Sequence, residues 1–511
     1  MSKKKEIGTH LTSSVLPALG FGAVSGALAG VAVTLYKYFA KGAVGASSAL
    51  FAFMREHLWL VPVVAIAALG VAFLLTRIYR KEPGLQGGGI PASVGTLRGL
   101  FRFHPIKDAV GSFFLSLVAF LFGVPLGTEG PSVQLSTALG AGAARYAPKK
   151  WRAWERFSMT GGASAGFSVA TGAPISGIFF AVEEAHGRIS PLIVLTAVVA
   201  VLFAELCAYA LSPLLGVEVA LFDVKSFQAL DLKEYWMPLL AGVVMGAVAY
   251  GFLKLYHLLD DLIRKKWRAP QQIKIFAVFA ATLVAGIFSG ELISTGHHLI
   301  GDLFVHTPSL LLLVGILLIR SVLTLSANIS GVTGGVFLPL LAIGSTAGVL
   351  LGKVLGVGEE LAPLFVVFGI AGCIAGMMKM PLTAILFGVE ALGLSQNLLP
   401  LILVCVFAYA IPEALGEESV GECVLERRKE LLHEGKTLTE EETEFTVEED
   451  AFAVGKEVRD IFWPDGVRVL SVKKAGSGHL LATGDQLLLR ISTYDRDLAL
   501  NELAHILKKE A

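Results

Sequence analysis

Long apolar segments follow one another from Val15 to about Ile411, separated by short polar stretches. This series constrains the fold strongly, because a helix needs about 20 apolar residues to cross a bilayer. Only 16% of the residues are charged and the mean hydropathy is +0.69, whereas a soluble domain carries about 25% charged residues. We therefore expect an all-α polytopic membrane protein. The clearest apolar runs are residues 15–36, 58–75, 113–122, 157–182, 189–204, 236–253, 275–290, 310–319, 336–351, 364–377 and 398–411.

Several of these runs are too short to span a membrane or are interrupted by Gly and Pro, as in repeat-built transporters. An internal repeat supports this interpretation. Residues 173–183 (APISGIFFAVE) and 380–390 (MPLTAILFGVE) share Pro, Ile, Phe, Val and Glu in register. The alternative is chance similarity between two apolar helices. A duplication predicts two similar halves whose broken helices meet at one central point.

Residues 127–132 (GTEGPS) place a single carboxylate, Glu129, after a charge-free run that begins at residue 109. An ionisable side chain inside a membrane costs several kcal/mol and is a functional candidate by default. The flanking Gly and Pro residues break the helix and leave backbone N–H groups free, and these attract anions. We expect an anion site beside a titratable carboxylate; the alternative is a Glu that only caps a buried helix.

The remaining composition excludes several classes of protein. The formal net charge is zero, so no nucleic-acid polymer is expected as a partner. The four cysteines lack metal-ligand spacing, and those in apolar runs are expected to pack as small hydrophobes. The histidines at 297, 298 and 306 form no convincing catalytic constellation with a Ser or Cys nucleophile, so we expect no enzyme and no cofactor. The basic start, with lysines at positions 3–5, predicts a retained first helix with a cytoplasmic N-terminus.

The composition changes after Ile411. We predict a transport domain at residues 1–427, a charged linker at 428–443 and a small α+β cytoplasmic domain at 444–511. Within that domain the pattern predicts strands at 445–447, 467–472 and 486–492, and helices at 454–462 and 497–508.

The motifs GGGIP (87–91), GTEGP (127–131) and GVFLP (335–339), with Glu183-Glu184 after Ala173-Pro174, together resemble those of the CLC family of chloride channels and chloride/proton antiporters. The resemblance covers residues 15–427. It implies the CLC fold with two inverted repeats and broken helices, in a homodimer with one pathway per subunit. It also implies a multi-pass protein of a prokaryotic cell (plasma) membrane that transports chloride or a similar small anion.

The resemblance implies a role for each matching residue. Glu129 matches the gating glutamate that competes with anions and carries a proton, and Glu184 matches the internal proton-relay glutamate. The alternative for Glu184 is a solvated glutamate at a helix end. Glu183 is expected to be structural, because Glu390 repeats it. Anion contacts, mainly from backbone amides, are implied for Gly88, Gly89, Ile90, Gly130, Val336, Phe337 and Gly421.

Three positions depart from the family pattern. Gly88 stands where the family has an anion-coordinating serine, and Gly421 falls at the position of its tyrosine. Thr128 replaces the arginine of the gating motif. Losing two hydrogen-bond donors to an anion, at roughly 1.5–3 kcal/mol each, predicts loose, amide-dominated anion binding.

Residues 444–511 resemble the RCK-C (TrkA-C) ligand-binding domain, through Gly455-Lys456, residues 467–472 and Thr483-Gly484-Asp485. This resemblance implies a regulatory domain with cyclic di-AMP as its ligand; the alternative is a dimer-stabilising appendage without a ligand. For the whole chain, we expect a chloride/proton antiporter. A passive voltage- or ligand-gated anion channel and a fluoride/proton antiporter remain as alternatives.

Overall fold

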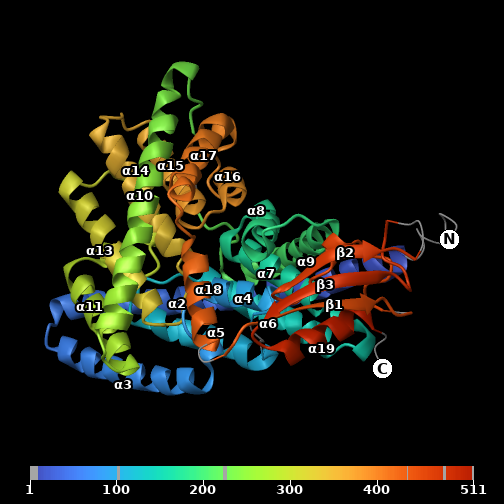
Figure 1. The fold of residues 1–511 in the computed structure, drawn as a ribbon. Coiled ribbons are helices and arrows are strands. Elements are labelled where there is room, and N and C mark those ends of the chain that lie inside the picture. Colours follow the sequence, from blue (N-terminus) through green and yellow to red (C-terminus); the bar gives the residue numbers. More distant parts are fainter. Residues whose placement is uncertain are drawn as a thin grey trace.

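The computed structural model describes residues 10–100, 104–222, 227–433, 436–449, 451–475 and 479–508 (Figure 1). Long helices form most of the molecule, and a small three-stranded sheet lies at one end. Among the described residues, eight helices are long and apolar enough to cross a membrane. The expectation of a polytopic helical membrane protein is therefore confirmed.

The membrane domain consists of two sets of helices with the same order of long and short elements. The first set is α2 (Leu16–Glu56), α3 (Leu60–Lys81), α4 (Gly89–Leu97), α5 (Pro105–Leu121), α6 (Glu129–Arg145), α7 (Glu155–Thr171), α8 (Pro174–Phe180) and α9 (Pro191–Leu215). The second is α10 (Trp236–Asp260), α11 (Gln271–Phe288), α12 (His297–Val305), α13 (Leu310–Ile329), α14 (Phe337–Val354), α15 (Ala362–Met377), α16 (Pro381–Glu390) and α17 (Leu398–Ala414). α18 (Val420–His433) follows and packs against α4.

Short π and 3-10 segments connect these helices at several bends. They are η1 (Leu11–Val15), η2 (Pro83–Leu85), η3 (Lys149–Trp154), η4 (Ala181–His186), η5 (Leu232–Glu234), η6 (Asp261–Lys266), η7 (Gly290–Leu292) and η8 (Ser395–Asn397). Two matter below: η1 precedes α2, and the π-helical η4 continues α8 and carries Glu184.

Reciprocal contacts join the two halves. Gly127 N–H donates to Gly335 O at 2.6 Å, and Gly335 N–H donates to Gly127 O at 2.9 Å. The Glu183 carboxylate accepts hydrogen bonds at the start of α16, and the Glu390 carboxylate does so at the start of α8. When residue i contacts j and the equivalent of j contacts the equivalent of i, the two parts are related by an approximate two-fold axis.

The two capping carboxylates have matching sets of donors. Glu390 accepts from the amides of Ile175 (2.8 Å) and Ser176 (2.9 Å) and from the Ser176 hydroxyl (2.9 Å). Glu183 accepts from the amides of Leu382 (2.9 Å) and Thr383 (2.7 Å) and from the Thr383 hydroxyl (2.6 Å). Each carboxylate therefore satisfies orphan N–H groups in the first turn of the partner helix. This arrangement gives the repeated Glu the structural role expected of it.

The C-terminal domain is an antiparallel sheet of order β1-β3-β2, covered by α19. Its elements are β1 (Thr439–Thr446), η9 (Val458–Asp460), β2 (Val467–Lys473), β3 (Gln486–Thr493) and α19 (Arg496–Leu507). A separate apolar core, which includes Leu487, Leu489 and Leu503, holds it together. The predicted small α+β domain is therefore present.

Two local expectations differ from this structure. The stretch between α18 and β1 is shorter than the predicted linker 428–443, because α18 continues to His433 and β1 starts at Thr439. The predicted helix at 454–462 is wrong: only the short 3-10 turn η9 forms there. Gly455 has φ +78°, a left-handed value that interrupts an α-helix.

The C-terminal domain docks on the first half of the membrane domain, beside α6, α7 and α9 (Figure 1). Arg156 of α7 donates to Glu502 Oε2 at 2.6 Å and to the carbonyls of Phe462 and Trp463. Lys456 is buried and donates to Ser13 O of η1, so the start of the described chain meets the C-terminal domain directly.

Candidate functional site

Three glycine-rich turns meet where α4, α6 and α14 begin. A Cβ atom on Gly89 would lie 2.0 Å from Gly130 O, and one on Gly130 would lie 2.6 Å from Gly335 Cα. Contacts this close exclude any side chain, so glycine is required for the helix N-termini to converge. Gly88, Gly89 and Ile90 at the start of α4 are all buried. The predicted anion-contacting backbone of the three motifs is thus brought together.

Glu129 lies at the first position of α6 and is fully buried. Its Oε1 accepts a hydrogen bond from Thr128 Oγ1 at 3.0 Å. Its Oε2 would lie 2.6 Å from a Cβ on Gly127, so Gly127 leaves room for the carboxylate. The same Cβ position lies 3.0 Å from Pro339 Cδ and 3.1 Å from Leu338 Cβ, and Oε2 forms no hydrogen bond with any described residue. The carboxylate thus lies between the starts of α6 and α14, among the positive ends of the two helices.

Val336 caps α14 and Phe337 is its first residue. The Phe337 ring is fully buried and packs edge-to-face on Phe167 (centroids 5.1 Å apart) and Phe387 (5.8 Å). The ring is therefore part of the core, and Phe337 can offer only its backbone to an anion.

The two positions that lack the family hydroxyls have different surroundings. A Cβ on Gly88 would meet only ordinary contacts, at 3.5 Å from Asn328 Nδ2 and from Pro91 Cδ. A Cβ on Gly421, near the start of α18, would lie 2.6 Å from Glu184 Oε1. The space that a side chain at 421 would need is therefore occupied by the Glu184 carboxyl group.

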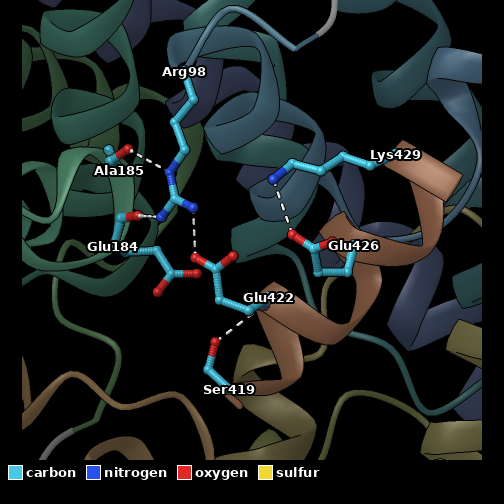
Figure 2. A network of polar contacts seen from close by, with 7 residues as sticks. All are labelled: Arg98, Glu184, Ala185, Ser419, Glu422, Glu426 and Lys429. Carbon is cyan, nitrogen blue, oxygen red and sulfur yellow. Dashed lines mark hydrogen bonds and ion pairs between the residues drawn. The ribbon is translucent and has the colours of Figure 1, made fainter. Parts of the chain in front are cut away.

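Glu184 lies in η4 and is buried, with 9% of its surface exposed. The Arg98 guanidinium donates to Glu184 O at 3.0 Å and to Ala185 O at 3.3 Å, and it pairs with Glu422 Oε1 at 2.6 Å. Figure 2 shows the carboxyl groups of Glu184 and Glu422 on the same side of this guanidinium. The solvated helix-end alternative for Glu184 does not match this burial.

Four polar residues near these groups were not identified from the sequence. Arg98 and Glu422 hold η4 and α18 together, and Asn328 lies beside Gly88. Lys37, in the middle of α2, donates to Val169 O (3.1 Å) and Val219 O (3.2 Å). Lys37 could have been identified from the sequence, because it is a charged residue inside an apolar helix. The other three residues lie in no local motif that marks them.

The cysteines and the acidic residues form no metal centre within the described ranges, where no group of three or more His, Cys, Asp or Glu side chains could hold an ion. Cys373 and Cys405 are fully buried, as expected for small apolar residues in a helical core.

Comparisons with known proteins agree with this geometry. Residues 67–413 match the protein family described as "Voltage gated chloride channel". The H(+)/Cl(-) exchange transporter ClcA of Vibrio parahaemolyticus is 28% identical over 387 residues, covering 72% of this chain and 80% of the relative. ClcA of Salmonella paratyphi B is 26% identical over 385 residues, covering 72% of this chain and 79% of the relative.

Solved structures share the fold. A slow cyanobacterial Cl-/H+ antiporter superposes with a TM-score of 0.72 at 23% identity, covering 81% of this chain and 98% of that one. A CLC-type fluoride/proton antiporter superposes with a TM-score of 0.64 at 22% identity, covering 78% and 96%. Because the family match spans most of the chain and the fold is the same, this protein belongs to the voltage-gated chloride channel (CLC) family.

Proposed function

We propose that this protein exchanges chloride, or a similar small anion, for protons across the membrane. The observation that carries the proposal is a pair of buried carboxyl groups, Glu129 where helix N-termini converge and Glu184 against α18. The relatives named H(+)/Cl(-) exchange transporter ClcA support the same activity.

In this proposal Glu129 is the gate. An ionised carboxylate among the N-termini of α6 and α14 takes the place that an anion would take there. Protonation removes its charge and with it the attraction to the amides, so an anion can replace it. One side chain then links the movement of a proton to the movement of an anion.

Glu184 is the second proton site in this proposal. It lies on the side of the membrane domain where the C-terminal domain docks, because His186 of the same η4 segment packs against Phe462 (centroids 4.6 Å apart). We assign this side, with both chain termini, to the cytoplasm. A proton that reaches Glu184 from that side can pass inward to the gate.

The alternatives are a passive anion channel and a fluoride/proton antiporter. A channel has no need for a second buried carboxyl group, and the burial of Glu184 therefore favours exchange. The fold of the fluoride/proton antiporter resembles this chain less closely than that of the cyanobacterial antiporter, with TM-scores of 0.64 and 0.72. Chloride is therefore the first substrate to test.

Reconstitution into liposomes tests the proposal. An imposed chloride gradient should drive uphill proton movement, followed as a change in external pH, and E129Q and E184Q should abolish it. Glu413→Gln is a matched control, because Glu413 pairs with Lys379 and its side chain is 52% exposed. Anion flux without any pH change in the wild type would identify a channel, and repeating the assay with fluoride would identify the third alternative.

We further propose that the C-terminal domain regulates transport and that the protein acts as a homodimer. A cavity of about 470 Å³ lies between this domain and the membrane domain. Arg145, Arg152 and Arg156 line it together with Glu155 and Glu502, so a phosphate-bearing ligand such as cyclic di-AMP would find cationic groups there. A thermal shift of the full-length protein with cyclic di-AMP, absent with AMP, would support this; no shift at saturation would contradict it.

A further inference from the structure

Asn328 has a buried side-chain amide that finds no partner in the described part of the chain. It lies near the end of α13, 4% exposed, and neither Nδ2 nor Oδ1 has a hydrogen-bond partner among the described residues. An unpaired buried polar group costs about 1–3 kcal/mol. Such groups are rare in folded proteins and call for an explanation, such as strain, a functional role, or a water or ion that the group binds.

The amide lies at the start of α4, where the family's hydroxyl donor is missing. Nδ2 is 3.5 Å from the position that a Cβ on Gly88 would occupy. Gly88 is the N-cap of α4, and no side chain caps this helix. An anion at this N-terminus would therefore meet free backbone N–H groups and the Asn328 amide together.

We propose that Asn328 is a side-chain ligand of the transported anion and supplies the hydrogen bond that Gly88 cannot make. The assignment rests on the proposed anion transport. A primary amide donates two hydrogen bonds and carries no charge, so it stabilises an anion without holding it permanently as an ion pair would. Within the described ranges no acceptor holds the amide, so its NH₂ group can turn toward the anion.

The test combines chloride affinity with thermal stability. Asn328→Leu keeps the side-chain size and removes both polar atoms. Because hydrogen bonds to charged groups contribute about 1.5–3 kcal/mol, chloride affinity measured by calorimetry should fall about tenfold or more. Thermal stability without chloride should stay equal or rise, because an unpaired buried amide has been removed.

Asn397→Leu is the matched control. Asn397 is also buried, but its Oδ1 accepts from Leu230 N and its Nδ2 donates to Gln228 O, both at 2.8 Å. This variant should lose stability and keep its chloride affinity. Asn328→Leu combined with Gly88→Ser should recover affinity, because a side chain at 88 meets only ordinary contacts and the φ of −73° suits any residue.

The outcomes separate the two levels of the proposal. Unchanged chloride affinity in N328L, or a loss of chloride-free stability like that of N397L, would overturn the ligand assignment while leaving anion transport intact. A wild type that neither binds nor moves any small anion would overturn the proposed function, and the ligand assignment with it.

A second, independent observation concerns the path of the proton. Glu422 follows Gly421, against which the Glu184 carboxyl group lies, and one Arg98 guanidinium contacts both residues. The Glu422 side chain is 35% exposed, whereas Glu184 is buried.

We infer that Glu422 passes protons between water and Glu184. The proton leaves the Glu422 carboxyl group for the Glu184 carboxylate, and Glu422 takes up another proton from solvent. Arg98 holds the Glu422 side chain near Glu184, because its guanidinium also donates to Glu184 O and Ala185 O. This step also rests on the proposed exchange.

Glu426 offers a matched control one turn along α18. It pairs with Lys429 at 2.9 Å and is 50% exposed (Figure 2). Glu422→Gln should slow proton flux in liposomes severalfold, Glu422→Asp should recover part of it, and Glu426→Gln should behave as wild type. Chloride affinity should not change in any of them. Wild-type proton flux in E422Q, or a parallel loss of chloride affinity, would overturn this assignment, whereas absent proton flux in the wild type would overturn exchange itself.

Discussion

Replacing Gly421 by alanine should move the Glu184 carboxyl group without unfolding the protein. The new Cβ would lie 2.6 Å from Glu184 Oε1, the far end of a flexible side chain, and 3.6 Å from Ser419 Oγ. Restoring ordinary contact requires a shift of roughly 1 Å, and leaving a preferred rotamer costs about 0.5–1.5 kcal/mol. Alanine in place of a helical glycine gains about 0.5–1 kcal/mol. The net change in stability should therefore be close to zero.

The change in transport should be large by comparison. A displacement of 1 Å in a reacting group can cost about 100-fold in rate, so proton flux through Glu184 should fall by at least severalfold. Chloride affinity should remain near that of the wild type, because α18 keeps its backbone. The assay is proton and chloride flux in the same liposomes, with calorimetry for affinity. A G421A protein with wild-type proton flux and stability would refute the placement of Glu184 against α18.

Three further predictions concern the scaffold. E183Q and E390Q should each destabilise the folded protein by about 2 kcal/mol, because each removes a charged acceptor from a helix start; matching falls in thermal unfolding temperature would confirm this, and a stable variant of either would contradict it. G89A should fail to yield folded protein on size-exclusion chromatography, since its Cβ would lie 2.0 Å from Gly130 O. Burial lowers the pKa of Lys456 to about 7, with Asp460 opposing the shift, so the unfolded state binds more protons above that pH and stability of the docked domain should rise from about pH 7 to pH 10; K456M should flatten the profile, and a flat wild-type profile would contradict the burial.

Much of the membrane domain could be predicted because its signals repeat. The shared Pro, Ile, Phe, Val and Glu of residues 173–183 and 380–390 correspond to α8 with η4 and to α16, and the two Glu residues cap each other's helices. The convergence of the glycine-rich turns could also be predicted, because only glycine permits contacts as short as that between Gly89 and Gly130.

The parts that failed depend on contacts between distant segments. The segment predicted as a helix, residues 454–462, contacts both domains. Phe462 packs on Phe157 and His186 of the membrane domain, whereas Val454 and Val458 pack on the core of the C-terminal domain. The spacing of apolar residues in this segment predicts a helix, but it does not show that some of them pack against another domain. The proposed roles of Asn328 and Glu422 could not be predicted from the sequence either, because they depend on contacts with the distant residues Gly88 and Arg98.

The exchanged carboxylates between α8 and α16 also have a consequence for synthesis of the chain. Ile175 and Glu390, which form one of these bonds, are 215 residues apart. At about 5–20 residues per second, the ribosome needs roughly 10–40 s after making α8 to synthesise Glu390, which caps that helix. The first half therefore enters the bilayer before Glu390 exists. Until the second half is made, the N–H groups at the start of α8 need another hydrogen-bond partner.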